Sequence, residues 1–173
     1  NSYFAYAPYI REMNVWLKYV DEVIIIAPLE HKKRTSIHTS YEHKNIKFIP
    51  IPKMNLLSFK SVFMSILHTP KVSWYIFKAM GDADHIHLRC PGNIGLLGCL
   101  IQVLFPNKVK TAKYAGNWDP KSKQPLSYKI QKWILNNTIL TKNCTTLFKG
   151  KWNEFFKKLR PFLLLPIVKK IKI

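Results

Sequence analysis

Acidic residues are scarce in this chain of 173 residues. There are 9 Asp and Glu against 28 Lys and Arg, which gives a formal net charge of +19 at pH 7. Such an imbalance favours anionic partners, namely nucleic acid, phosphate-bearing substrates or an acidic membrane surface. The chain is also 47% hydrophobic and 13% aromatic, so it is too apolar to be a disordered basic tail. One ordinary globular domain with a real core is therefore expected.

Cysteine is also rare, and its spacing excludes the usual cysteine-based frameworks. Cys90, Cys99 and Cys144 are odd in number, and their separations match neither a zinc site nor a disulfide scaffold. We expect three free, buried thiols in a reducing cytoplasm.

A long apolar run is missing as well. The longest, IGLLGCLIQVLF at 94–105, is much shorter than the roughly 20 residues that a membrane-spanning helix needs. No signal peptide opens the chain, which begins with Asn1 rather than Met. We expect a cytoplasmic protein, in peripheral contact with the inner face of the plasma membrane at most, and a chain that is a fragment of a longer one.

The apolar pattern alternates between strand and helix along the chain. Short apolar runs typical of buried parallel strands occur at 22–28, 45–52, 84–89, 108–116 and 144–150. Helical spacing predicts helices at 8–20, 56–68, 71–80, 93–105 and 126–140, with Pro70 separating the second from the third. Residues 30–45 are polar and predict a surface loop. This order predicts an α/β fold, a Rossmann-like open parallel sheet with helices on both faces.

The helix predicted at 8–20 has no strand in front of it. The first strand of a doubly wound sheet is central. We therefore expect a gap in the middle of the sheet, where a strand upstream of Asn1 would belong.

A glycine-rich turn, HLRCPGNIGLLG at 87–98, follows the third predicted strand. Gly92, Gly95 and Gly98 are spaced G-x-x-G-x-x-G, which is neither the dinucleotide fingerprint nor the Walker loop, so a dinucleotide-binding domain is disfavoured. A second interpretation is that Gly92 allows a tight turn, Asn93 caps the next helix, and the other two glycines let that helix pack closely on the sheet. The turn lies at the carboxyl end of a strand, where α/β sheets bind ligands, although a turn that only packs explains the pattern equally well.

The fourth predicted strand ends in a similar polar turn, KYAGNWDP at 113–120. Tyr114, Asn117 and Trp118 offer aromatic faces and an amide, and Gly116 permits close approach. Such residues suit a sugar, and two such turns at neighbouring strand ends predict a ligand crevice.

Three segments, YAPYIREMNVWLKYVDEVIIIAPL, HIHLRCPGNIGLLG and KYAGNWDPKSKQPLSYKIQKWIL, resemble the N-terminal half of bacterial group 1 (family 4) glycosyltransferases. The likeness is greatest to those of Bacteroidetes-type polysaccharide clusters, and it runs from about Tyr3 to about Trp152. It implies the GT-B fold, with residues 1–152 as an incomplete acceptor-side domain. Residues 153–173 depart from the family pattern as a basic, apolar tail.

The resemblance also implies an activity, the transfer of a sugar from a nucleotide-sugar donor to an acceptor hydroxyl with retention, without a metal or other cofactor. Its setting is polysaccharide or glycolipid biosynthesis, with a glycan or lipid-linked acceptor. The nucleotide-sugar is bound by a C-terminal domain that this chain lacks, so this chain alone is expected to be inactive.

The residues that match the acceptor side of the cleft come from the two turns. They are Arg89, Gly92, Asn93, Tyr114, Gly116, Asn117 and Trp118. Tyr9, Arg11 and Glu12, at the start of the first helix, are further cleft candidates. Arg89 could bind an acceptor phosphate or carboxylate, or form a structural ion pair. The sequence assigns no catalytic residue.

Two other interpretations remain beside this one. The group Asp82, Asp84, His85 and His87 resembles a metal site, but strand alternation places the two histidines on one face and Asp84 on the other, so no metal is expected. A basic nucleic-acid-binding α/β module would need lysines gathered with aromatics on one face. Lysine is instead scattered along the chain, in most of the predicted elements and in the loops, so a nucleic-acid partner is not expected.

Overall fold

The computed structural model describes residues 3–30, 33–54, 58–117, 123–148 and 170–172. A six-stranded sheet has the order β4-β2-β8-β5-β6-β7, and all its neighbouring strands are parallel. Its strands are β2 (Glu22–Pro28), β4 (Ile46–Ile51), β5 (His85–Cys90), β6 (Val109–Tyr114), β7 (Cys144–Phe148) and β8 (Lys170–Lys172). The α/β class and the five predicted parallel strands are confirmed, and the sheet is not closed into a barrel.

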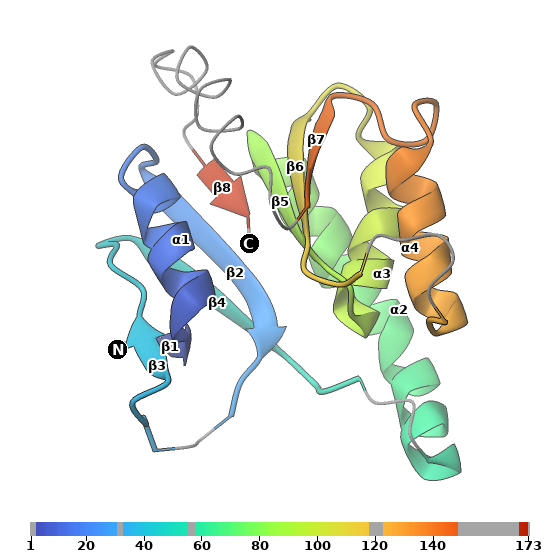
Figure 1. The fold of residues 1–173 in the computed structure, drawn as a ribbon, viewed down its shortest axis with the longest axis horizontal. Helices are drawn as coiled ribbons and strands as arrows, with labels where there is room; N and C mark the ends of the chain where they lie inside the picture. Colours follow the sequence, from blue (N-terminus) through green and yellow to red (C-terminus); the bar gives the residue numbers. More distant parts are fainter. Residues whose placement is uncertain (1–2, 31–32, 55–57, 118–122, 149–169, 173) are drawn as a thin grey trace.

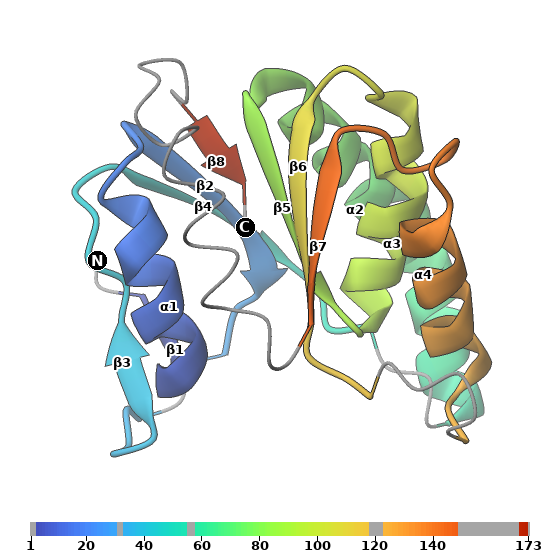
Figure 2. The ribbon, with the colours of Figure 1, turned by 45° about the horizontal axis from the view of Figure 1, so that its top comes forward.

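Helices cover both faces of this sheet (Figures 1 and 2). On one face lies α1 (Ala7–Leu17); on the other lie α2 (Phe59–Asp82), α3 (Asn93–Ile101) and α4 (Leu126–Asn136). A short 3₁₀ turn, η1 (Gln102–Leu104), follows α3. A hydrophobic core lies on each face of the sheet, because alternate side chains of a strand point to opposite faces. Val23 and Ile25 of β2 pack with α1 on one face. Ile86 and Leu88 of β5 belong to the core on the other face, beneath the remaining helices.

The second helix differs from the prediction. Pro70 was expected to separate two helices, but α2 continues through it as one helix of 24 residues. Pro70 is exposed, so its ring meets solvent rather than a packed neighbour. The hydroxyl of Thr69, one residue before it, donates to the carbonyl oxygen of Ser65 at 2.8 Å. Burial of the opposite side, through residues such as Val72 and Ile76, holds the helix together across the proline.

Three short strands were not predicted, and two of them lie outside the central sheet. β1 (Phe4–Tyr6) and β3 (His38–Ser40) form an antiparallel pair of their own, and β3 lies inside the segment expected to be a surface loop. The side chain of Asn14 connects α1 to this pair of strands. Its Nδ2 donates to the Ser40 carbonyl oxygen, and its Oδ1 accepts from the backbone N–H of Glu42. Three residues are too few to show a period, so the pattern could not reveal these strands.

The centre of the sheet is occupied by β8. Lys170–Lys172 pair with Glu22–Ile24 of β2 on one side, and Ile171 and Lys172 pair with His85 and Ile86 of β5 on the other. This is the position where a gap was expected. The pairing covers only the first half of the two neighbours, so Ile25–Pro28 and His87–Cys90 extend past β8 toward the carboxyl edge. For the end of the chain, residues 155–173, the pattern predicts poor packing without a sheet partner, because this segment continues no strand–helix unit. That prediction is wrong for Lys170–Lys172, which fill the expected gap as β8, and the rest of the segment, including Phe162–Val168, lies outside the described residues.

Candidate functional site

The candidate site is built on β5, whose side chains alternate between the two faces of the sheet. Ile86, Leu88 and Cys90 enter the core beneath α2, α3 and α4. His85 and His87 therefore point to the α1 face together, and so does Arg89 at the carboxyl end. The first two are buried and the third is exposed, so a polar row leads from the interior to the edge of the sheet.

The two histidines share one hydroxyl and one indole. His85 Nε2 and His87 Nδ1 lie 2.9 and 2.8 Å from Oγ1 of Thr111 on β6. The ring of Trp16 from α1 packs against both, with centroids 6.0 Å from His85 and 5.4 Å from His87. Burial lowers the pKa of His85 to about 4, and burial, with His85 and Arg89 nearby, lowers the pKa of His87 to about 3. Both imidazoles are thus neutral near pH 7.

An ion pair crosses from α1 to β6 beside this row. Lys113 Nζ donates to Glu12 Oε2, and the two side chains are 18% and 15% exposed. Partial burial lowers the pKa of Lys113. The second carboxylate oxygen, Glu12 Oε1, is buried and has no hydrogen-bond partner among the described residues. This oxygen can therefore accept a hydrogen bond from a ligand.

Arg89 lies over the aromatic ring of Tyr9, with Cζ 3.8 Å from the ring centroid. Within the described part of the chain, no ion pair links Arg89 to a carboxylate. Burial raises the pKa of Tyr9, and burial raises the pKa of Tyr41 to about 12, while Arg89 opposes both shifts. Tyr9 Oη is buried without a partner among the described residues. The stacked cation leaves guanidinium N–H groups for an anionic or hydroxyl-bearing ligand.

These groups form one site, which we call the α1-face polar cluster. It consists of Tyr9, Glu12, Trp16, Tyr41, His85, His87, Arg89, Thr111 and Lys113. Two features hold it together: Arg89 and Lys113 are direct partners in the β5–β6 register, and Tyr9 and Glu12 are one turn apart on α1.

Sequence reasoning named some members of this cluster and missed others. Tyr9, Glu12 and Arg89 were candidates, and the cluster joins them. Lys113, Thr111 and Tyr41 were missed. Period-two alternation alone could have indicated Thr111 and Lys113, which share a strand face, whereas nothing in the sequence marks Tyr41.

The candidates in the glycine-rich turn lie elsewhere. Gly92 is the N-cap of α3, with an extended φ of 168°, and a side chain there would meet nothing within 4 Å, so the expected need for glycine in a tight turn is wrong. Asn93 is the first residue of α3 rather than its cap, and its Nδ2 donates to the Met54 carbonyl at 2.8 Å. The expected close packing is seen at Gly95, where an added Cβ would lie 2.6 Å from the Arg89 carbonyl oxygen.

The second turn faces the core opposite α1. Tyr114 is 1% exposed and packs within that core, and its hydroxyl donates to Gln124 Oε1 at 3.4 Å. Gly116 lies close to the Tyr114 ring, and the Asn117 carbonyl accepts from the Gln124 side chain. Trp118 is outside the described residues. Arg11 of α1 is exposed, on the side of the helix away from the sheet.

The cysteines and carboxylates of the described segments form no metal-binding group of three or more. Cys90 and Cys99 are buried free thiols with their sulfur atoms 3.5 Å apart, and Cys144 is a partly buried free thiol. Burial raises the pKa of Cys144 to about 11.

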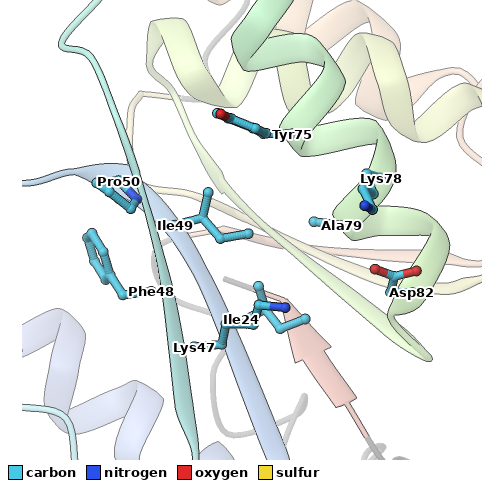
Figure 3. A pocket seen from close by; sticks show the side chains of 9 residues that line it. All are labelled: Ile24, Lys47, Phe48, Ile49, Pro50, Tyr75, Lys78, Ala79 and Asp82. Carbon is cyan, nitrogen blue, oxygen red and sulfur yellow. The ribbon is translucent and has the colours of Figure 1, made fainter.

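A pocket of about 390 Å³ lies apart from the cluster, between β4 and α2 (Figure 3). Apolar residues such as Ile24 and Ile49 line it together with Tyr75, Lys78 and Asp82. Most of these belong to the α2 side of the sheet, so the pocket does not connect to the polar row on β5.

Comparison of the chain with protein-family models, with curated proteins and with solved structures finds no match. No helix in the described segments has the length and apolar content to cross a membrane.

Proposed function

We propose that this chain is the acceptor-binding part of a retaining glycosyltransferase of the GT-B type, acting in polysaccharide or glycolipid biosynthesis. The observation that supports it best is the meeting of Arg89, Tyr9 and Glu12 near the carboxyl edge of the sheet. All three were candidates from the family resemblance, yet they come from segments about 80 residues apart. Ligands of α/β sheets bind at this edge.

The chemistry of the cluster suits a hydroxyl-rich, anionic acceptor. Arg89 is an exposed cation with N–H donors, which would bind a phosphate or carboxylate. Glu12 Oε1 would accept a hydrogen bond from a sugar hydroxyl, while Lys113 pairs with the other carboxylate oxygen. Unpaired buried polar atoms such as this oxygen and Tyr9 Oη each cost about 1–3 kcal/mol, so a ligand or a water that pairs with them gains affinity.

The finer parts of the proposal follow from the resemblance. Residues 1–152 would be a Rossmann-like acceptor-side domain, and residues 153–173 a tail of separate character. The nucleotide-sugar would be bound by another domain, without a metal, and the catalytic group is not assigned to this chain. The place of β8 in the sheet would correspond to the first strand of such a domain.

A titration of the isotope-labelled chain, followed by NMR, tests the proposal. The ligands are neutral oligosaccharides, the same sugars carrying a phosphate, and UDP- and GDP-sugars. We expect phosphorylated saccharides to shift the signals of Tyr9, Glu12 and Arg89, and nucleotide-sugars without acceptor to shift little. Arg89→Ala should weaken this binding by about 10- to 100-fold, the scale of one charged hydrogen bond, whereas Lys18→Ala at the exposed end of α1 should not.

Saccharides that shift no signal, or that shift only signals far from Arg89, would overturn the proposal. The titration should also include a short duplex DNA and a single-stranded RNA. Salt-dependent binding of either, with no saccharide binding, would favour the basic nucleic-acid module instead.

A further inference from the structure

The solvent-facing side of α2 is apolar. Phe63, Ile66, Leu67 and Trp74 are 62%, 62%, 56% and 60% exposed, and Phe77 is 39% exposed. Their spacing places all five on one stripe of the helix. The opposite side, which includes Val72 and Ile76, is buried in the core, so α2 is apolar on both sides. A surface helix normally presents polar residues to water.

This stripe, which we call the α2 apolar surface, consists of Phe63, Ile66, Leu67, Trp74 and Phe77. Its aromatic end is packed: the rings of Trp74 and Phe77 stack at 5.9 Å, and Phe77 lies 5.3 Å from the ring of Phe105. Leu104, in the turn just before Phe105, is 65% exposed. Exposed apolar residues gathered in this way, rather than scattered singly, mark an interaction surface.

The charged residues of α2 are all lysines until the end of the helix. Lys71 and Lys78 are exposed beside the stripe. The only carboxylate in α2 is Asp82, its last residue. The whole chain carries a formal charge of +19. A partner for this surface must therefore be both apolar and anionic.

We infer that the α2 apolar surface docks onto an anionic lipid surface. Aromatic and aliphatic side chains would enter the boundary between headgroups and acyl chains, with Lys71 and Lys78 at the level of the headgroups. A second copy of the chain fits less well, because it would bring two highly positive molecules and their lysines together. The orientation also suits the site: α2 begins after the carboxyl end of β4, and its first turns extend beyond that edge of the sheet (Figure 1).

Sedimentation of the chain with vesicles tests this inference. We expect the chain to sediment with vesicles of phosphatidylcholine containing about a third phosphatidylglycerol, and less so with phosphatidylcholine alone or in high salt. The double variant Phe63→Ser/Trp74→Ser should lower partitioning by about 10-fold or more. Lys71→Glu/Lys78→Glu should lower it at least as far, since each lysine near an anionic surface contributes a factor of about 5.

The matched control is Trp133→Ser on α4, which removes a tryptophan of similar exposure, 62%, from another surface. It should bind vesicles within about 2-fold of the parent chain. Circular dichroism establishes that each variant is folded. Absence of binding to anionic vesicles, or an equal loss in the control, would overturn the inference. So would a dimer in solution that Phe63→Ser/Trp74→Ser dissociates, because a second copy would then be the occupant.

This inference does not rest on sugar transfer, and the two can fail separately. Arg89→Ala should bind vesicles like the parent chain, because Arg89 lies on the α1 face of the sheet. A chain that binds vesicles but no saccharide would support lipid docking by α2 and contradict the proposed glycosyltransferase. A chain that binds saccharides but no vesicles would support the acceptor site and contradict lipid docking.

Discussion

His85 and His87 are held neutral by their surroundings, and this links folding to pH. Their pKa values are about 4 and 3 in the folded chain, against an ordinary value of 6.5. Between about pH 4 and 6.5 the unfolded chain therefore binds more protons. The folded state is therefore favoured fully above pH 6.5. As the pH falls through this window, each histidine lowers the free energy of unfolding by about 1.4 kcal/mol per pH unit.

His87→Gln should reduce this pH dependence. The variant loses one of the two buried imidazoles, so the slope of unfolding free energy against pH between 6 and 4.5 should decrease by about 1.4 kcal/mol per unit. Urea denaturation at a series of pH values measures it. Trp133→Ser on α4, which leaves all 6 histidines in place, should keep the parent slope. An unchanged slope in His87→Gln would show that this imidazole is not kept neutral by burial.

Arg89 shows how one side chain can serve both packing and binding. Its guanidinium stacks on Tyr9 while its carbonyl oxygen lies under Gly95 of α3. The residue thus joins helices on opposite faces of the sheet. A substitution that shifts its backbone should disturb the candidate site as well as the core.

Where β5 meets α3, close approach of helix and strand depends on Gly95 and Gly98 but not on Gly92. An alanine Cβ at Gly95 would lie 2.6 Å from a backbone oxygen that cannot move alone, whereas one at Gly92 would meet nothing within 4 Å. Gly95→Ala should therefore lower the unfolding free energy by about 1–3 kcal/mol, despite the higher helix propensity of alanine.

Gly92→Ala is the matched comparison and should change stability by less than about 0.5 kcal/mol, because its backbone is extended. Both values come from urea denaturation under identical conditions. The reverse ranking, or equal costs, would mean that α3 does not approach β5 this closely.

Across the whole molecule, β8 joins the two halves of the sheet. It is the only described strand between β2 and β5, and without it these strands have no hydrogen-bonded neighbour on that side. The helices also connect the two halves, because α2 contacts β2 and α3, and α3 lies on β5.

Removal of residues 170–173 should therefore loosen the sheet centre first. Hydrogen exchange followed by mass spectrometry should show exchange about tenfold faster, or more, in peptides that contain Val23 and Ile86, the residues next to β8. Peptides from β6, which lies between β5 and β7, serve as the internal control. Equal acceleration everywhere would indicate global destabilisation, and no acceleration would mean that β8 does not protect its neighbours.

Local sequence determined the five longer strands of the central sheet, most of the helices and the direction of many side chains. The apolar runs at 22–28 and 84–89 could be identified because burial on both faces of a parallel sheet requires such runs. Period-two alternation was enough to place His85 and His87 on one face, and helical spacing placed the Ile10 and Met13 side of α1 in a core. These features depend on contacts within one element.

Only the tertiary structure decided which elements meet. It brought Tyr9, Glu12, Arg89 and Lys113 together on the α1 face, and it turned Asn93 and Tyr114 toward other partners. It carried α2 through Pro70 and placed β8 between β2 and β5. The reason is physical: periodicity fixes which way a side chain leaves its own backbone, whereas the partner that it meets is chosen by long-range packing and sheet register, which no local pattern encodes.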